Sequence, residues 1–295
     1  MGCASNTRQI DQLLSQIPND LAMQAQVSDV PFINQNMGHC GPATLAMVLQ
    51  WNGMTISADQ LAPQIFTPNM QGSFQTDMVS AARRNSMMAV QIEGLQSLLE
   101  EIQAGHPVIV FENLGINWLP QYHYAVVHGY DLNRKVLVMH SGPKANEKID
   151  LREFERSWRL GDYWGLVVLP PGKLSISGSE VSHIQAAAGL EQILKIDEAF
   201  LSYRAIQNRW PKSLGALIGL GNVTYLLKKY SKSAQILRSA TASHPQSAIA
   251  WHNLALAEYA ANRRKQAKLS AKRALELAMP QDKTYYESRL RLILD

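Results

Sequence analysis

The sequence predicts an α+β domain followed by an all-α domain of repeated helical hairpins, and two observations carry this prediction. Up to about residue 170, segments with helical spacing come first and short β-rich runs come later, an order typical of α+β folds and not of βαβ alternation. From residue 180 onward the chain is helical throughout, and its pattern repeats at a fixed interval. A length of 295 residues fits two domains.

The charge distribution divides the chain at the same place. Residues 1–173 carry 11 Lys and Arg against 15 Asp and Glu, a net charge of −4, whereas residues 174–295 carry 17 against 9, a net charge of +8. A basic helical surface can bind nucleic acid, but basic residues on solvated helix faces are commoner, so we expect no nucleic-acid partner. No apolar run approaches the roughly 20 residues of a membrane-spanning helix.

Local start and stop signals predict the helices of the first domain. The clearest signal is Ser57 followed by Gln60, which is the spacing of a capping box. A glycine directly after an apolar run marks a helix end. The predicted helices are part of residues 1–28, residues 44–50 with a stop at Gly53, a short helix from Ser57, residues 76–85 capped by Thr76, and residues 95–104 with a stop at Gly105.

Runs of apolar and β-branched residues predict an antiparallel sheet after these helices. Two of the runs flank the turn-forming segment 131–134 and therefore form a hairpin. The predicted strands are residues 108–111, 123–130, 135–140 and 163–169.

The helical half repeats with a period of about 34 residues, which is the length of a tetratricopeptide unit. Trp251 lies one such period beyond Leu217, and Ala255 lies one such period beyond Gly221. This period and these offsets match the tetratricopeptide pattern, in which small residues at the crossing points let paired helices approach. The three predicted hairpins and the final capping helix are residues 180–280 and 283–294.

The chain therefore divides into four predicted parts. Pro170, Pro171 and Gly172, followed by alternating serines, indicate a linker. The predicted parts are a tail at residues 1–28, the α+β domain at residues 29–170, the linker at residues 171–179 and the helical domain at residues 180–295.

The first candidate functional residue is Cys40, which directly precedes a predicted helix. A thiol attacks only as the thiolate, and a helix start lowers its pKa through unpaired amides and the helix dipole. Gly41 permits close backbone approach, and Pro42 suits a first helical turn. Gln35, five residues upstream, can donate a hydrogen bond to a developing oxyanion. This context favours a nucleophile over the alternative, a small buried core thiol.

A cysteine nucleophile needs a base, and His123 is the best candidate. It opens a predicted strand, where a sheet edge meets a cleft. Because side chains alternate along a strand, His123 and His128 lie on opposite faces and cannot both line one site. His128 has apolar neighbours, so a core or surface position is commoner for it than a site position.

The returning strand supplies the group that orients His123. If the hairpin closes with Tyr130 opposite Asn133, His123 faces His140, and if Tyr130 lies opposite Lys135, the two histidines are diagonal neighbours. Both registers place the two histidines on one face. The candidate orienting residues are His140 and, as the weaker one, Ser141.

These motifs resemble those of the double-glycine leader peptidases, the papain-like family that trims bacteriocin precursors and forms the front domain of their exporters. The resemblance covers about residues 30–169 and depends on the Gln that precedes Cys-Gly-Pro-Ala by five residues and on His-Tyr-Ala-Val-Val before a hairpin. It implies a papain-like fold with helices packed on an antiparallel sheet. It also implies that Gln35 is an oxyanion-hole donor, Cys40 the nucleophile and His123 the base of a thiol-dependent peptidase.

The sequence departs from that family at the orienting position. The family usually has Asp, often followed by Pro, where this chain has His140 and Ser141. A neutral imidazole can accept a hydrogen bond from His123, but it stabilises an imidazolium less than a carboxylate does. We therefore expect reduced or pH-dependent activity. Papain-like sites tolerate a neutral Asn here, so the departure does not by itself imply an inactive enzyme.

The N-terminal segment bears on location. Residues 1–6 lack the regions of a secretory signal, yet Gly-Cys followed by small residues resembles the end of a bacterial lipoprotein signal. That resemblance implies a lipid anchor at Cys3, a location facing the periplasm, and membrane contact through the anchor alone. The alternative is an ordinary terminal segment of a cytoplasmic protein. The whole organisation also resembles a bacterial family of stand-alone relatives without a transporter.

Two other functions remain open. Tetratricopeptide stacks present concave surfaces to peptides, so the chain could be a binding or scaffold protein with weak or no catalysis. A zinc site built from Cys40, His39, His123 and His140 would suit the metal's ligand preferences, but no paired ligand spacing supports it. We expect no metal and no cofactor, a peptide or protein substrate, and a protein partner on the helical repeats.

Overall fold

The computed structural model describes residues 7–34, 40–67, 72–116 and 118–295. The chain forms two compact units. The first unit comprises Met1–Pro170 and Leu174–Ala186, and the second comprises Pro171–Lys173 and Ala187–Asp295. Most of the predicted linker, residues 174–179, therefore belongs to the first unit.

The first unit contains an antiparallel sheet with the strand order β4-β9-β5-β6-β7-β8, in which β1 also pairs with β6. Its strands are β1 (Gln24–Gln26), β4 (Met88–Glu93), β5 (Val108–Asn113), β6 (Tyr122–Asp131), β7 (Val136–Ser141), β8 (Lys144–Asp150) and β9 (Trp164–Leu169). The predicted α+β class is confirmed, although β1, β4 and β8 were not predicted. A separate pair joins β2 (Phe66–Thr67) to β3 (Gly72–Ser73).

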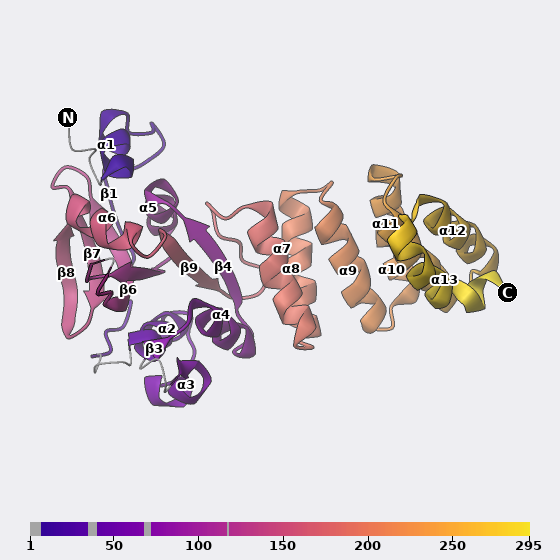
Figure 1. The fold of residues 1–295 in the computed structure, drawn as a ribbon, viewed down its shortest axis with the longest axis horizontal. Helices are drawn as coiled ribbons and strands as arrows, with labels where there is room; N and C mark the ends of the chain where they lie inside the picture. The colour runs from indigo at the N-terminus through magenta and orange to yellow at the C-terminus, as the bar shows by residue number, and fades with distance from the viewer. Residues whose placement is uncertain (1–6, 35–39, 68–71, 117) are drawn as a thin grey trace. The chain divides into compact units, whose positions relative to one another are not determined.

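Helices cover both faces of this sheet (Figure 1). Ala125 and Val127 of β6 pack with one group of helices, whereas Tyr124 and Val126 pack with the other, as strand alternation requires. The first group is α1 (Arg8–Ser15), α5 (Leu95–Gln103) and α6 (Leu151–Arg159). The second group is α2 (Cys40–Trp51), α3 (Ala58–Ile65) and α4 (Gln75–Arg84). The faces are thus distinct cores, and the face of a side chain decides what it can contact.

Most of the local helix signals are confirmed. The Ser57 amide donates to Gln60 Oε1 at 2.8 Å and the Gln60 amide donates to Ser57 Oγ at 3.2 Å, which completes the predicted capping box. Gly53 and Gly105 follow helix ends with φ of 84° and 86°. The prediction for Thr76 is wrong, because α4 begins at Gln75 and its N-cap residue is Phe74.

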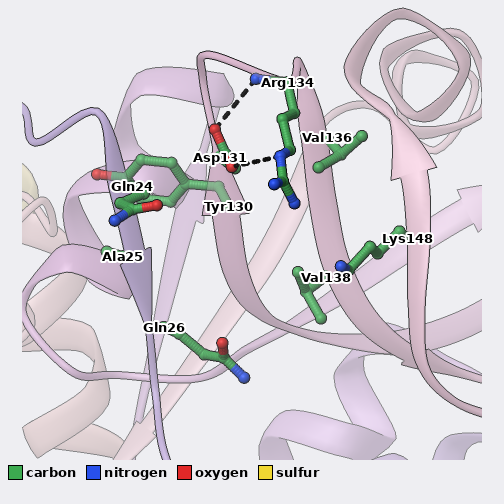
Figure 2. A pocket seen from close by; sticks show the side chains of 9 residues that line it. All are labelled: Gln24, Ala25, Gln26, Tyr130, Asp131, Arg134, Val136, Val138 and Lys148. Carbon is green, nitrogen blue, oxygen red and sulfur yellow. Dashed lines mark hydrogen bonds and ion pairs between the residues drawn. The ribbon is translucent and has the colours of Figure 1, made fainter.

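The β6–β7 hairpin does not have either predicted register. Its turn is closed by Asp131, which accepts a hydrogen bond from the Arg134 amide at 3.0 Å and pairs with the Arg134 side chain (Figure 2). Tyr130 lies opposite Leu137, and the register then shifts between Val127 and Gly129.

A cavity of about 420 Å³ lies beside this turn, and none of the predicted site residues lines it.

The register shift has a direct consequence for the two histidines. After it, Val126 lies opposite His140. Directly opposed residues share a face, so His140 shares the face of Val126 and not that of His123. Ser141, one residue further on, shares the face of His123.

The predicted linker is anchored at its serines. Glu101 of α5 is fully buried and accepts hydrogen bonds from Ser175 Oγ at 2.6 Å, from the Ser177 amide at 2.7 Å and from Ser177 Oγ at 2.7 Å. His106 Nδ1 lies 2.7 Å from the same carboxylate. The carboxylate therefore holds this segment on the first unit.

The second unit consists of helical hairpins at the predicted period. The helices α7, α9 and α11 begin at residues 180, 214 and 248, an even spacing that equals the repeat found in the sequence. At Gly221 an added Cβ would lie 2.6 Å from Leu237, so the small residue permits the close crossing that the sequence predicts. The helices are α7 (Glu180–Gln192), whose first part up to Ala186 belongs to the first unit, α8 (Ile196–Arg209), α9 (Leu214–Leu226), α10 (Tyr230–Ser243), α11 (Ala248–Ala260), α12 (Arg264–Leu277) and α13 (Pro280–Leu294).

An ion pair with a buried carboxylate also ties three of these helices together. Glu258 of α11 is 2% exposed and pairs with Arg238 of α10 at 2.7 Å. Ser270 of α12 donates to the other carboxylate oxygen at 2.8 Å. Among the helices that the structure describes, none is long and apolar enough to cross a bilayer.

Candidate active site

Cys40 is the first residue of α2 and is partly buried. The next residue must be small, because a Cβ at Gly41 would lie 2.5 Å from Ser73 Oγ and 2.8 Å from Ser73 Cβ. Strand β3 therefore packs directly against the helix start. Tyr124 donates a hydrogen bond from its hydroxyl to the Ser73 carbonyl at 3.1 Å, which joins β6 to the same strand.

The environment of the thiol opposes its ionisation. Burial raises the pKa of Cys40, and the backbone N–H groups of Tyr124, Gly41 and Cys40 itself act in the opposite direction without outweighing it. The helix start therefore does not give the lowered pKa that the sequence predicts. Cys40 is a neutral thiol near pH 7 in the free protein.

His123 lies near the start of β6, as predicted, and directly precedes Tyr124, whose backbone amide faces the Cys40 sulfur. The imidazole Nε2 lies 3.1 Å from Ser141 Oγ. Within the described part of the chain, no hydrogen bond joins His123 directly to Cys40, and Nδ1 has no hydrogen-bond partner. The backbone beside His123 therefore lies close to Cys40, whereas strand alternation gives the His123 side chain the face of Ala125 and Val127, opposite to the face that α2 covers.

Burial lowers the pKa of His123, and the carboxylate of Glu147 opposes this effect. The resting pair is therefore a neutral imidazole and a neutral thiol. Glu147 lies on β8 and was not singled out from the sequence, because β8 itself was not predicted.

Glu112 is a second carboxyl group that sequence reasoning missed. It lies opposite His123 in the β5–β6 register and is 1% exposed. Burial raises its pKa to about 7, reinforced by the charges of Glu147 and Glu153 and opposed by a hydrogen bond from Ser157. A charged residue that directly follows the apolar run 108–111 was the available signal.

The prediction that His140 orients His123 is wrong. His140 is 2% exposed, its Nε2 lies 3.1 Å from the Val30 carbonyl, and its Nδ1 accepts the Asn146 amide at 3.1 Å. Both ring nitrogens are therefore engaged away from His123, on the other face of the sheet. Ser141, the weaker of the two candidates, makes the contact instead.

The remaining predicted residues have different outcomes. Gln35 and His39 lie outside the described residues. Among the residues that are described, no three His, Cys, Asp or Glu side chains form a group that could hold a metal ion. His123 and His140 of the zinc hypothesis also point to different faces of the sheet.

Aromatic side chains surround the start of β6. Tyr122 stacks on Phe111 with ring centroids 5.1 Å apart, and Phe111 also contacts Tyr124. Trp164 is buried against these rings, whereas Trp118, in the loop before β6, is 81% exposed. The start of β6 is therefore flanked by packed aromatic rings.

Comparison with known proteins identifies a family and solved structures that the first unit resembles. The model of the Peptidase_C39 like family matches residues 27–163. No curated protein matches the chain significantly. A C39-like peptidase from Bacillus anthracis is similar at 21% identity, with 52% of this chain and 98% of that chain covered and a TM-score of 0.43.

Two further solved structures resemble one half of the chain each. The peptidase domain of Streptococcus ComA, a bi-functional ABC transporter involved in quorum sensing, is 22% identical over 48% of this chain and 99% of its own, with a TM-score of 0.41. The first tetratricopeptide domain of Spaghetti, bound to an HSP90 peptide, is 20% identical over 39% of this chain and 89% of its own, with a TM-score of 0.36.

The motif at the start of α2, the strand near whose start His123 lies and the family match all concern the same part of the first unit. They agree with the resemblance predicted from the sequence: residues 27–163 of this chain match the Peptidase_C39 like family.

Proposed function

We propose that the protein is a cysteine peptidase in which Cys40 is the nucleophile and His123 the base. The observation that carries this proposal is the contact between His123 Nε2 and Ser141 Oγ at 3.1 Å. When Nε2 carries the ring proton and donates a hydrogen bond to Ser141 Oγ, Nδ1 is the unprotonated nitrogen that can accept a proton from the thiol.

The reaction follows from these roles. His123 takes the proton of Cys40, the sulfur attacks the carbonyl carbon of the peptide bond, and the C–N bond breaks as His123 returns the proton to the leaving amine. Water then attacks the thioester with His123 again as base, which releases the new carboxylate and restores the thiol. We propose Gln35 and the Cys40 backbone amide as the oxyanion donors.

The electrostatics of the site determine how such an enzyme would behave. Because burial raises the pKa of Cys40 and lowers that of His123, forming the thiolate–imidazolium pair is unfavourable in the free protein. Ser141 contributes a hydroxyl dipole and no net charge. Substrate binding that excludes water strengthens the attraction within the pair, so activity would depend on a well-bound substrate more than in a site with a carboxylate.

The test is iodoacetamide alkylation of the full chain across pH, with Cys3→Ser to leave one thiol. We expect Cys40 to react more slowly than a free cysteine at pH 7, and the rate to rise into the alkaline range. His123→Ala should slow alkylation near pH 7 and have no effect once Cys40 is ionised. An alkylation rate that is the same in wild type and in His123→Ala at every pH would refute the assignment of the base.

Hydrolysis is tested separately with a mixed peptide library analysed by mass spectrometry. Wild type should produce new termini that Cys40→Ala does not produce. Because the family implies cleavage after small residues, the library should include Gly-Gly and Gly-Ala sequences. Identical products from both proteins would exclude the peptidase under these conditions and favour the binding function.

We also propose that the second unit binds a peptide or protein partner. It contains a cavity of about 270 Å³ whose apolar lining is Tyr225, Leu226, Leu237 and Leu256. Asn222, Asn253 and Arg289 line it with polar groups, and the two amides hydrogen-bond to each other at 2.8 Å. Leu256→Glu should abolish capture of a partner, whereas Leu269→Glu, on an exposed position of α12, should not.

A further inference from the structure

The end of the β7–β8 hairpin is bulged. Met139 lies opposite Glu147 and Ser141 lies opposite Lys144, so His140 faces two residues of β8, Ala145 and Asn146. Such a bulge interrupts the ladder and leaves a backbone group that needs another partner. Asn146 has φ of 53°, a left-handed conformation that Asn tolerates.

His140 supplies the partner that the ladder lacks. Its Nδ1 accepts the Asn146 amide at 3.1 Å, so its proton is on Nε2, which donates to the Val30 carbonyl at 3.1 Å. One neutral imidazole thus joins the bulge to the segment that follows β1. Both nitrogens are used, and replacement by a residue with one polar group leaves a buried backbone group unpaired.

Packing holds the imidazole in this orientation. His128 stacks on it with ring centroids 4.4 Å apart, and the ring of Phe32 lies 5.4 Å away. Burial and the neighbouring His140 lower the pKa of His128 to about 4, and a polar interaction with the backbone of Val27 opposes this shift. The stacked ring is therefore neutral near pH 7. Each histidine lies at a register shift, His128 in β6–β7 and His140 in β7–β8.

The hairpin end that His140 holds carries the groups that act on His123. Ser141 contacts the imidazole directly, and Glu147 raises its pKa. Lys144 forms an ion pair with Glu147 across the same bulge. Slippage of the bulge would therefore move the hydroxyl and the carboxylate together.

We propose that His140 is a positioning residue: it holds the bulged end of the hairpin so that Ser141 stays within hydrogen-bond reach of His123. This inference depends on the proposed function of Cys40 and His123. It assigns to His140 an indirect role from the face opposite to that of the base.

Two substitutions separate the two hydrogen bonds of His140. In His140→Asn the amide oxygen occupies the place of Nδ1 and can still accept the Asn146 amide. In His140→Gln the terminal amide reaches the place of Nε2 and can still donate to Val30, but the bulge loses its acceptor. Both variants remove the imidazole ring, so both lose the stacking on His128 to the same extent. Thermal unfolding reports whether each variant is folded.

The readouts are the pH profile of Cys40 alkylation and the titration of His123 followed by NMR of labelled histidine, both in the Cys3→Ser background. We expect His140→Gln to lower the alkylation rate at pH 7 by about three- to tenfold and to shift the His123 titration, as Ser141→Ala does. His140→Asn should stay within about twofold of wild type. Adding His140→Gln to Ser141→Ala should have a smaller effect on both readouts than adding it to wild type, because only the influence of Glu147 is left to lose.

Equal effects of His140→Asn and His140→Gln, or an unchanged His123 titration in His140→Gln, would overturn the inference. The NMR readout does not require that His123 activates Cys40. If His123→Ala leaves alkylation unchanged while His140→Gln still shifts the His123 titration, the proposed function fails and the positioning role stands.

Discussion

The imidazole of His123 and the hydroxyl of Ser141 are in contact at 3.1 Å, across the open end of the β6–β7 hairpin. This contact gives the imidazole a neutral partner. It explains why the free site favours an uncharged pair, since no negative charge lies within hydrogen-bond distance of the imidazole to offset its burial in the described part of the chain.

Substitutions at Ser141 should therefore change the alkylation rate of Cys40, upward with a carboxylate and downward when the hydroxyl is lost. A carboxylate in Ser141→Asp would raise the pKa of His123 and favour the thiolate–imidazolium pair, so alkylation at pH 6 should be faster than in wild type. Ser141→Ala loses a hydrogen bond of about 1 kcal/mol, and alkylation should slow about fivefold. Stopped-flow alkylation at pH 6 and pH 9 measures this. Equal rates for all three proteins at pH 6 would contradict the role of Ser141.

The close approach of Gly41 to β3 predicts a second effect. In Gly41→Ala the new methyl group would overlap the side chain of Ser73, and overpacking of this kind lowers the free energy of unfolding by about 1–3 kcal/mol. Ser73→Gly removes both atoms that collide, so the double variant should recover most of the loss. Urea unfolding measures all three proteins. A loss that persists undiminished in the double variant would mean that Ser73 is not the obstacle.

The Glu101 carboxylate should make the stability of the first unit dependent on pH. Burial raises its pKa, but hydrogen bonds from His106, Ser175 and Ser177 outweigh this, so the pKa is below its usual value of 4.5. A group whose folded pKa is lowered stabilises the fold above its unfolded pKa and loses this effect as the pH falls through the folded pKa.

Glu101→Gln should therefore lower the free energy of unfolding by about 2 kcal/mol at pH 7, and the difference from wild type should shrink below pH 4.5. Denaturant unfolding at pH 7, 5 and 3.5 tests this. Glu100→Gln, at the neighbouring less buried position, is the matched control and should have little effect. A difference that grows in acid would show that the carboxylate is not the stabilising form.

The ion pair of the buried Glu258 carboxylate should contribute more than a pair in which both side chains are exposed. Glu258→Gln weakens contacts to Arg238 and Ser270, and we expect it to lower the free energy of unfolding by about 2 kcal/mol. Glu276→Gln, which removes the exposed pair with Arg273, should change it by less than about 0.5 kcal/mol. Hydrogen exchange should localise the first effect to α10–α12. Similar effects of both substitutions would contradict this ranking.

Features that depend on near neighbours were predictable from the sequence. The capping box of Ser57 and Gln60 needs only two residues on one turn, and both its hydrogen bonds are present. The tetratricopeptide period fixes helix starts because each hairpin packs on the next in the same way. Cys40 and His123 were identifiable because the start of a helix and the start of a strand are local.

Which residue of β7 contacts His123 was not predictable in the same way. Counting from the turn assumes an unbroken ladder, and the shift between Val127 and Gly129 changes which residues share a face. One extra residue moves His140 away from the face of His123 and brings Ser141 to it. Strand β8 was missed because its exposed, charged sequence lacks the apolar alternation that marks a half-buried strand.

The anchoring of Ser175 and Ser177 on Glu101 affects how the peptidase-like unit can be isolated. A protein truncated after Pro170 would keep the carboxylate in its buried position and lose three of its hydrogen bonds. The carboxylate would then be destabilised, and its pKa would rise toward the range in which it is protonated. A cut placed after Ala186 keeps these donors with the unit that needs them. The serines therefore form part of the first unit, although their composition is that of a spacer.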